Sequence, residues 1–329
     1  MHRFLFVLFL IAAPASAQRT HVLVVSGISG EERFARQWAA WGNDVVAGLQ
    51  RAGVAAEDVV RLGEKPGGGV SARSTKEEIG RQVMRIAGSA GASDQVLLVL
   101  FGHGSEGEGG ARLNLPGPDL TGRELAAMLK GLGSRRVIVV NTASASGGFL
   151  EPLAGDNRVV ITATRSAGQN NETVFGEHFA AALAGDGADT DKDGRVSLLE
   201  AFTYARLEVE RAYASTNRMK SEHALLDADG DGTGTAEPDG RSGDGRAASG
   251  IYFGAGGASA IAADAAPADA SPELRALYAR RTAIQEEIDA LRARRDSVEV
   301  AAYERELERL LVELATVTQA IRSIEGGAQ

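Results

Sequence analysis

A histidine and a serine each follow an apolar run that is typical of a buried strand. His103 comes shortly after the run 96–101, and Ser144 comes shortly after the run 137–140. Continuous apolar runs of this length favour neighbouring central strands of a parallel sheet, whose carboxyl ends share one edge. An imidazole and a hydroxyl at that edge predict a hydrolase site.

The chain around these residues alternates between strand and helix patterns. Strands are expected at 21–27, 59–62, 96–103, 136–141 and 158–164, with a small hairpin near 111–115. Helices are expected at 32–52, 74–86, 122–132, 174–183 and 198–214, the second of them capped by Ser74 and Glu77. This alternation implies right-handed crossovers, so the predicted fold class is α/β: a doubly wound, mostly parallel sheet with helices on both faces.

Two motifs carry a resemblance to a known group of enzymes. His103-Gly104 and the segment 143–147 (Ala-Ser-Ala-Ser-Gly) resemble caspases, metacaspases and legumains, in which a His-Gly ends one strand and an Ala-Cys-x-Ser-Gly ends the next. Ser144 stands at the position of the nucleophilic cysteine, and the chain contains no cysteine. The resemblance implies that His103 is the general acid and base, that Ser144 holds the nucleophile position, and that the amides of Gly104 and Ser144 form the oxyanion hole.

The same resemblance implies a peptide or protein as substrate or ligand, with the loop 165–172 lining a specificity pocket. A serine hydroxyl needs a hydrogen-bonded base that a third group orients, whereas a thiol is already partly ionised. The sequence offers no obvious orienting carboxylate, and Thr142 replaces an acidic residue often found in this group. Two functions therefore stay open: an endopeptidase that uses Ser144 and His103, or a catalytically inactive pseudopeptidase that acts as a calcium-binding interaction or scaffold protein.

The segment 189–200 has the spacing of a complete EF-hand calcium loop. Gly194 supplies the sharp turn at position six, and Val196 is the apolar residue between ligands. The expected ligands are the side chains of Asp189, Asp191, Asp193 and Ser197, the carbonyl of Arg195 and a bidentate Glu200.

A second acidic segment, 227–238, repeats the first half of that pattern with Asp227, Asp229 and Asp231. Pro238 falls at position twelve, and Glu237 lies one residue early. The segment is either a second calcium loop or a flexible Gly-Asp turn. We expect bound Ca²⁺ to clamp the region after the sheet and to stabilise the fold by mass action.

The first residues predict export. A basic start, an apolar stretch and Ala15-Ser16-Ala17 before Gln18 have the layout of a secretory signal over residues 1–17, so the protein is expected in the periplasm or outside the cell. No later stretch reaches the roughly 20 apolar residues of a membrane helix, so no membrane contact is expected after cleavage. A net charge of −9 argues against nucleic-acid partners and favours cations.

The chain changes character after the expected peptidase-like domain, 18–253. Residues 254–270 are rich in Ala, Gly and Pro and read as a linker, and residues 271–325 carry two apolar runs at helical spacing. The runs are out of register across 296–300, where Asp296 and Glu299 could form a capping box. Two structures stay open: an antiparallel helical hairpin, through which the chain could dimerise, or one long parallel coiled coil.

Overall fold

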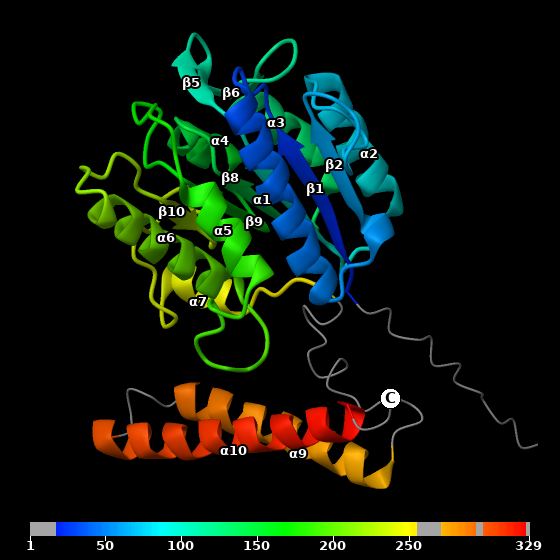
Figure 1. The fold of residues 1–329 in the computed structure, drawn as a ribbon, viewed down its shortest axis with the longest axis vertical. Coiled ribbons are helices and arrows are strands. Elements are labelled where there is room, and N and C mark those ends of the chain that lie inside the picture. Colours follow the sequence, from blue (N-terminus) through cyan, green and yellow to red (C-terminus); the bar gives the residue numbers. More distant parts are fainter. Residues whose placement is uncertain (1–17, 255–270, 294–298, 327–329) are drawn as a thin grey trace, which may run out of the picture.

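The structure, a computed structural model, describes residues 18–254, 271–293 and 299–326 (Figure 1). The expected signal segment and nearly all of the expected linker lie outside the described residues, as does Asp296. No helix of the described parts is long and apolar enough to cross a membrane.

A seven-stranded sheet in the order β10-β9-β8-β4-β1-β2-β3 forms the centre of the fold. Its strands are β1 (Thr20–Ser26), β2 (Val59–Gly63), β3 (Ala72–Arg73), β4 (Gln95–Phe101), β8 (Arg136–Asn141), β9 (Arg158–Thr162) and β10 (Leu225–Asp227). Neighbouring strands are parallel except β10, which runs antiparallel to β9 at one edge. A small antiparallel sheet holds β5 (Gly104–Gly107), β6 (Gly110–Leu113) and β7 (Leu120–Thr121). The predicted α/β class is confirmed.

Helices cover both faces of the main sheet (Figure 1). One face packs against α1 (Glu32–Arg51), α5 (Phe175–Ala184), α6 (Leu198–Ser215) and α7 (Gly243–Ser249). The other face packs against α2 (Lys76–Ser89), α3 (Gly122–Leu129) and α4 (Leu150–Leu153). Short 3-10 turns lie at η1 (Ala56–Asp58), η2 (Lys130–Leu132) and η3 (Ser146–Phe149).

The central strands are apolar throughout because both of their faces are covered. In β4, Leu97, Val99 and Phe101 face the α1 side, whereas the residues between them face the α2 side. Every residue of β4 is buried. This burial explains the continuous run from which the strand was predicted.

The expected cap of α2 is wrong by one residue. Thr75, not Ser74, is the N-cap, and its side chain accepts a hydrogen bond from the backbone N–H of Glu78 at 3.2 Å. Ser74 is fully buried, and its hydroxyl donates to the carbonyl of Ser26 at 2.6 Å. The Ser74 hydroxyl therefore ties the loop before α2 to the end of β1.

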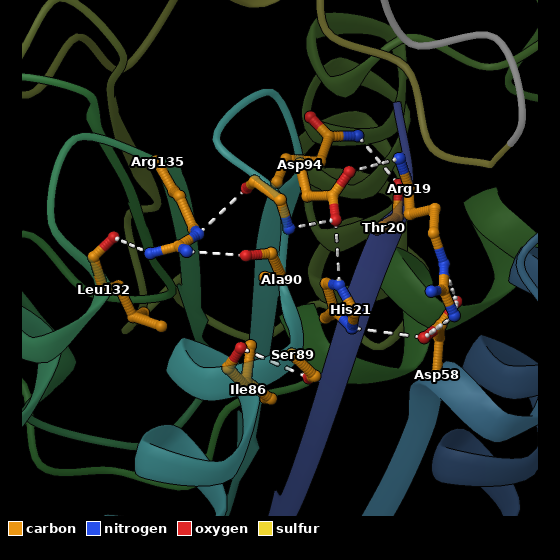
Figure 2. Close-up of polar contacts among 12 residues, drawn as sticks. Arg19, Thr20, His21, Asp58, Ile86, Ser89, Ala90, Asp94, Leu132 and Arg135 are labelled. Atoms are coloured by element: carbon orange, nitrogen blue, oxygen red, sulfur yellow. Dashed lines mark hydrogen bonds and ion pairs between the residues drawn. The ribbon is translucent and has the colours of Figure 1, made fainter. Parts of the chain in front are cut away.

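A charged cluster lies at the amino-terminal ends of the parallel strands (Figure 2). The His21 ring on β1 has Asp58 Oδ1 3.2 Å from Nδ1 and Asp94 Oδ2 3.2 Å from Nε2. The Arg19 guanidinium pairs with Asp58 at 2.7 Å. Arg135 donates to the carbonyls of Ala90, Gly91 and Leu132 beside this cluster. These contacts fix the strand starts and the loop before β4.

Two further helices, α9 (Pro272–Ala293) and α10 (Val300–Gly326), pack against each other around an apolar seam that includes Ile284, Ile288, Leu310 and Leu314. They run antiparallel, because Arg280 pairs with Glu313 and Arg309 lies 3.6 Å from Glu287. The Glu299 carboxylate accepts hydrogen bonds from the amides of Ala301 and Ala302 at the start of α10.

Candidate functional site

The ends of two neighbouring strands bring His103, Gly104 and Ser144 together. Strands β4 and β8 are paired in parallel, with Leu100 opposite Asn141, so the segments after them leave the same edge of the sheet. His103 and Ser144 line one pocket there.

The Ser144 hydroxyl is bound to the backbone of Gly104 on both sides. It accepts a hydrogen bond from the Gly104 N–H at 2.9 Å and donates to the Gly104 carbonyl at 3.0 Å. A side chain at position 104 would prevent this approach, because a Cβ there would lie 2.0 Å from the Ser144 carbonyl oxygen. The Ser144 residue is only 5% exposed. The hydroxyl is therefore held in the wall of the site.

The His103 ring is held by aromatic side chains of α1. Its centroid lies 4.4 Å from the Phe34 ring and 5.0 Å from the Trp38 ring, both in edge-to-face arrangements. Among the described residues, no hydrogen bond joins the imidazole to the Ser144 hydroxyl, and no carboxylate orients it. Packing therefore fixes the ring, whereas a serine-type triad needs hydrogen bonds at both ring nitrogens.

The turn after Ser144 has a strained backbone. Ala145 has a left-handed φ of 56°, which residues with a Cβ rarely adopt. Its N–H donates to the Gln169 carbonyl at 2.8 Å, and the Ser146 hydroxyl accepts from the amides of Ala163 and Thr164. The loop after β9 thus holds this turn in place.

The pocket beside His103 is small, and its wall combines aromatic and polar residues. Its lining consists of Phe34, Trp38, Trp41, Gly102, His103, Thr142, Ser144, Glu172 and Thr173. About 10 Å³ is open inside it, roughly the room that one water molecule needs. Thr173 donates from its hydroxyl to the Thr142 carbonyl at 2.6 Å, which fixes the far wall. Of the loop 165–172, Glu172 lines this pocket.

The first acidic loop places three carboxylates together, those of Asp189, Asp191 and Asp193, with one oxygen from each within 4.8 Å of the others. Burial raises the pKa of Asp193 to about 6, with Asp191 adding to the shift, and burial also raises the pKa of Asp189. Asp189 Oδ1 is buried and, among the described residues, without a hydrogen-bond partner. A cation would offset the cost of these buried charges.

The other predicted ligands of this loop have these positions. Glu200 Oε1 accepts hydrogen bonds from the N–H groups of Thr190 at 2.8 Å and Asp191 at 3.3 Å. The Ser197 hydroxyl donates to Glu200 Oε2 as part of the α6 capping box. Arg195, whose carbonyl is the predicted ligand, stacks its guanidinium over the Tyr252 ring at 4.0 Å. Glu200 thus reaches the loop from the start of α6.

The second acidic loop has an equivalent of Glu200 that the sequence spacing did not indicate. Asp227, Asp229 and Asp231 bring their carboxylates within 4.8 Å of one another. Asp244, in the first turn of α7, accepts from the N–H groups of Ala228 at 2.7 Å and Asp229 at 3.2 Å. These are the same two loop positions that Glu200 contacts in the first loop.

Asp244 was missed because it lies beyond the twelve-residue spacing of an EF-hand loop. It is 5% exposed, whereas the side chain of Glu237, which stands near position twelve, is 79% exposed and lies 3.6 Å from Arg206. One feature of the sequence could have drawn attention to Asp244: it follows Ser242, a residue type that often begins a helix.

Comparisons with known proteins agree with this architecture. Residues 76–224, which contain both His103 and Ser144, match the model of the peptidase C13 family. No curated protein matches this chain in sequence.

Solved structures are similar to this chain at low sequence identity. Protein GSU0716 from Geobacter sulfurreducens is 14% identical with a TM-score of 0.44, over 67% of this chain and 95% of that one. Caspase-1 from Spodoptera frugiperda is 14% identical with a TM-score of 0.42, over 64% of this chain and 88% of that one. The protein drICE is 14% identical with a TM-score of 0.38, over 60% and 84%.

Proposed function

We propose that this chain is an exported, calcium-stabilised pseudopeptidase that binds a peptide segment of a partner protein at the His103 edge without cleaving it. The observation that carries the proposal is the double hydrogen bond between the Ser144 hydroxyl and the backbone of Gly104. This contact occupies the Ser144 hydroxyl and the Gly104 N–H, and acyl transfer would need both of them free.

The chemistry explains why the contact opposes catalysis. A serine attacks a carbonyl only when a base takes its proton, and the Ser144 proton points to a backbone carbonyl, which is no base. The Gly104 N–H, which the resemblance assigns to the oxyanion hole, is bound by the hydroxyl itself. His103 is held by Phe34 and Trp38, and none of the described residues gives its ring a hydrogen bond that would set it up as a general base.

A serine-directed fluorophosphonate probe tests this proposal. We expect equal, background labelling of the wild type and of Ser144→Ala, and no turnover of a broad peptide library with calcium present. A known serine hydrolase in the same reaction verifies the probe. Labelling of the wild type that Ser144→Ala abolishes would overturn the proposal in favour of an endopeptidase.

The endopeptidase remains the second candidate function because of one observation, the left-handed Ala145 after Ser144. Strained non-glycine backbone persists where the surrounding structure holds it, and such positions cluster at active sites. If a bound peptide moved the Ser144 hydroxyl away from Gly104, the Gly104 N–H would become free for an oxyanion. Labelling in the presence of peptide, but not in its absence, would support this function.

The calcium part of the proposal rests on the two acidic loops. Each brings three carboxylates together, and N–H groups of each loop bind a further carboxylate at the start of the next helix, Glu200 or Asp244. Oxygen donors of this number and flexibility suit Ca²⁺. We infer one ion for each loop, and these ions stabilise the fold by binding the folded state.

Isothermal titration of the metal-free protein with Ca²⁺ tests both loops separately. Wild type should take up two ions, Asp189→Ala with Glu200→Ala should take up one, and Asp244→Asn should also take up one. Glu237→Gln is the matched control for Asp244→Asn and should leave two ions bound. Two ions bound by Asp244→Asn, or one by Glu237→Gln, would show that Asp244 is not a ligand.

A further inference from the structure

Gln169 connects the loop after β9 to the turn that follows Ser144. The Gln169 carbonyl accepts a hydrogen bond at 2.8 Å from the N–H of Ala145, the residue with the left-handed φ of 56°. Strained backbone of this kind persists only where neighbouring contacts hold it. The position of Gln169 therefore contributes to the shape of the site.

Three further contacts fix the side-chain amide of Gln169. Its Oε1 accepts a hydrogen bond from the N–H of Arg165 at 2.8 Å, and its Nε2 donates to the Ser221 carbonyl at 3.1 Å. The third contact joins Nε2 to His223 Nδ1 at 2.7 Å. A backbone N–H only donates and a backbone carbonyl only accepts, so these two partners fix which end of the amide faces which way. Nε2 is therefore the donor to His223, and His223 Nδ1 is an unprotonated acceptor.

The surroundings of His223 favour its neutral form. Burial lowers the pKa of His223, and the positive charges of Lys220, on its own segment, and Arg165, on the loop after β9, lower it further. The adjacent carboxylate, Glu222, is engaged at the start of α5, where it accepts a hydrogen bond from the N–H of Phe175 at 3.1 Å. The neutral ring that Gln169 requires is thus also the form that the folded protein stabilises.

We propose that Gln169 positions the strained turn after Ser144, and that His223 holds Gln169 in place only while its ring is neutral. Protonation adds an N–H at Nδ1, so that two donors face each other across 2.7 Å. Gln169 then loses this partner, and its carbonyl holds Ala145 less firmly. The inference does not depend on the proposed function, because these contacts are the same whether the site binds a peptide or cleaves one.

The direction of the pH effect follows from the lowered pKa of His223. The folded protein binds this proton less readily than the unfolded chain does. The contribution of His223 to holding the loop is therefore complete above about pH 6.5 and is lost as the pH falls below that value. Acidic solution should loosen the turn after Ser144.

Hydrogen exchange of the Ala145 N–H, followed by NMR at pH 7.5 and pH 4.5, tests the proposal. Each rate is divided by the intrinsic rate of an unprotected amide at the same pH, which gives a protection factor. The protection factor of Ala145 should fall about threefold to tenfold at the lower pH, the effect of losing one hydrogen bond. The reference amide is that of Thr142, which donates to the Leu100 carbonyl just before Ser144 and should keep its protection.

Matched variants assign the effect to His223. His223→Asn places an amide oxygen near the position of Nδ1 and cannot be protonated in this range, so the protection of Ala145 should stay high at both pH values. His178→Asn is the control, because burial lowers the pKa of His178 on α5 as well, and it should lose protection as the wild type does. Gln169→Leu keeps the size of the side chain without its amide and should show low protection at both pH values.

Three results would overturn this inference. The first is a constant protection factor of Ala145 in the wild type, and the second is the same loss in His223→Asn as in the wild type. The third is low protection in His223→Asn at both pH values, because an acceptor at this position would then not be what holds Gln169. Circular dichroism of each variant verifies that it is folded. The fluorophosphonate test of the proposed function reads catalysis and gives an independent answer.

Discussion

A histidine lies at each end of the parallel strands of the central sheet, His21 at the amino ends and His103 at the carboxyl ends. The surroundings of the two rings differ. At the amino-terminal edge, both ring nitrogens of His21 face carboxylates, those of Asp58 and Asp94 (Figure 2). At the carboxyl edge, His103 lies beside a hydroxyl but is held by aromatic rings. The two carboxylates that contact an imidazole and the hydroxyl of the candidate site therefore lie at opposite ends of the strands.

This difference shows that residue types alone do not make a catalytic site. A triad needs nucleophile, base and orienting group in one hydrogen-bonded line. His21 has the orienting groups without a nucleophile, and its buried network is suited to holding strands together. His103 has a neighbouring hydroxyl but no orienting group within the described part of the chain, and its pocket is suited to binding.

The largest effect is expected from removing the two histidines in turn. His21→Ala removes one hydrogen-bond partner from each of two carboxylates whose side chains are 7% exposed, so the free energy of unfolding should fall by about 2–5 kcal/mol. His103→Ala loses ring contacts with Phe34 and Trp38 and should cost about 1 kcal/mol. Urea unfolding of the two variants measures both values. A larger loss for His103→Ala would contradict the structural role given to His21.

A smaller loss is expected when the glycine at the site gains a side chain. In Gly104→Ala the new Cβ would lie 2.0 Å from the Ser144 carbonyl oxygen, so the turn must shift at a cost of about 1–3 kcal/mol. Gly88→Ala, in α2, has no atom within 4 Å of its new Cβ and serves as the control. Thermal unfolding of both variants gives the comparison. Equal stability of the two would mean that the contact between Gly104 and Ser144 is looser than described.

Ser144→Ala should cost about 1 kcal/mol, because the hydroxyl makes two hydrogen bonds to Gly104 that water cannot fully replace at this buried position. Ser89→Ala, at the exposed end of α2, should leave the free energy of unfolding unchanged. Denaturant unfolding measures both variants. A stability gain in Ser144→Ala would show that the hydroxyl is strained, as a retained catalytic group would be.

The smallest effect concerns the pH dependence of the amino-terminal edge. Burial alone would raise the pKa of Asp94, but hydrogen bonds from the N–H groups of Arg19 and Gly91 and from His21 outweigh it and hold the pKa below its usual range. Its stabilising contribution is therefore present above about pH 4 and lost as the pH falls through the lowered value. The stability difference between wild type and Asp94→Asn should narrow as the pH is lowered from 6 to 3. A constant difference would contradict this.

The sequence allowed the sheet and the meeting of His103 with Ser144 to be predicted, because buried parallel strands leave continuous apolar runs and share one edge. The pocket wall and the second acidic loop depend on contacts between distant parts of the chain, which the spacing of residues in the sequence does not reveal. Phe34, Trp38 and Trp41 had the spacing of a core-facing helix stripe, and in the structure they also form the pocket wall. Asp244 joins the second acidic loop through the path of the chain after it.

The outer strand β10 ends at Asp227, the residue at which the second acidic loop begins. That loop returns along β10, where Leu226 and Thr235 exchange two backbone hydrogen bonds at 3.0 and 2.7 Å. The amide and carbonyl of Leu226 are thus satisfied within the molecule, and the opposite border of the sheet, β3, is only two residues long. An edge strand whose backbone N–H and C=O groups are unpaired can pair with a strand of another molecule. The folded-back loop therefore leaves less of β10 open to a strand of another molecule, so a change that displaces the loop should favour aggregation.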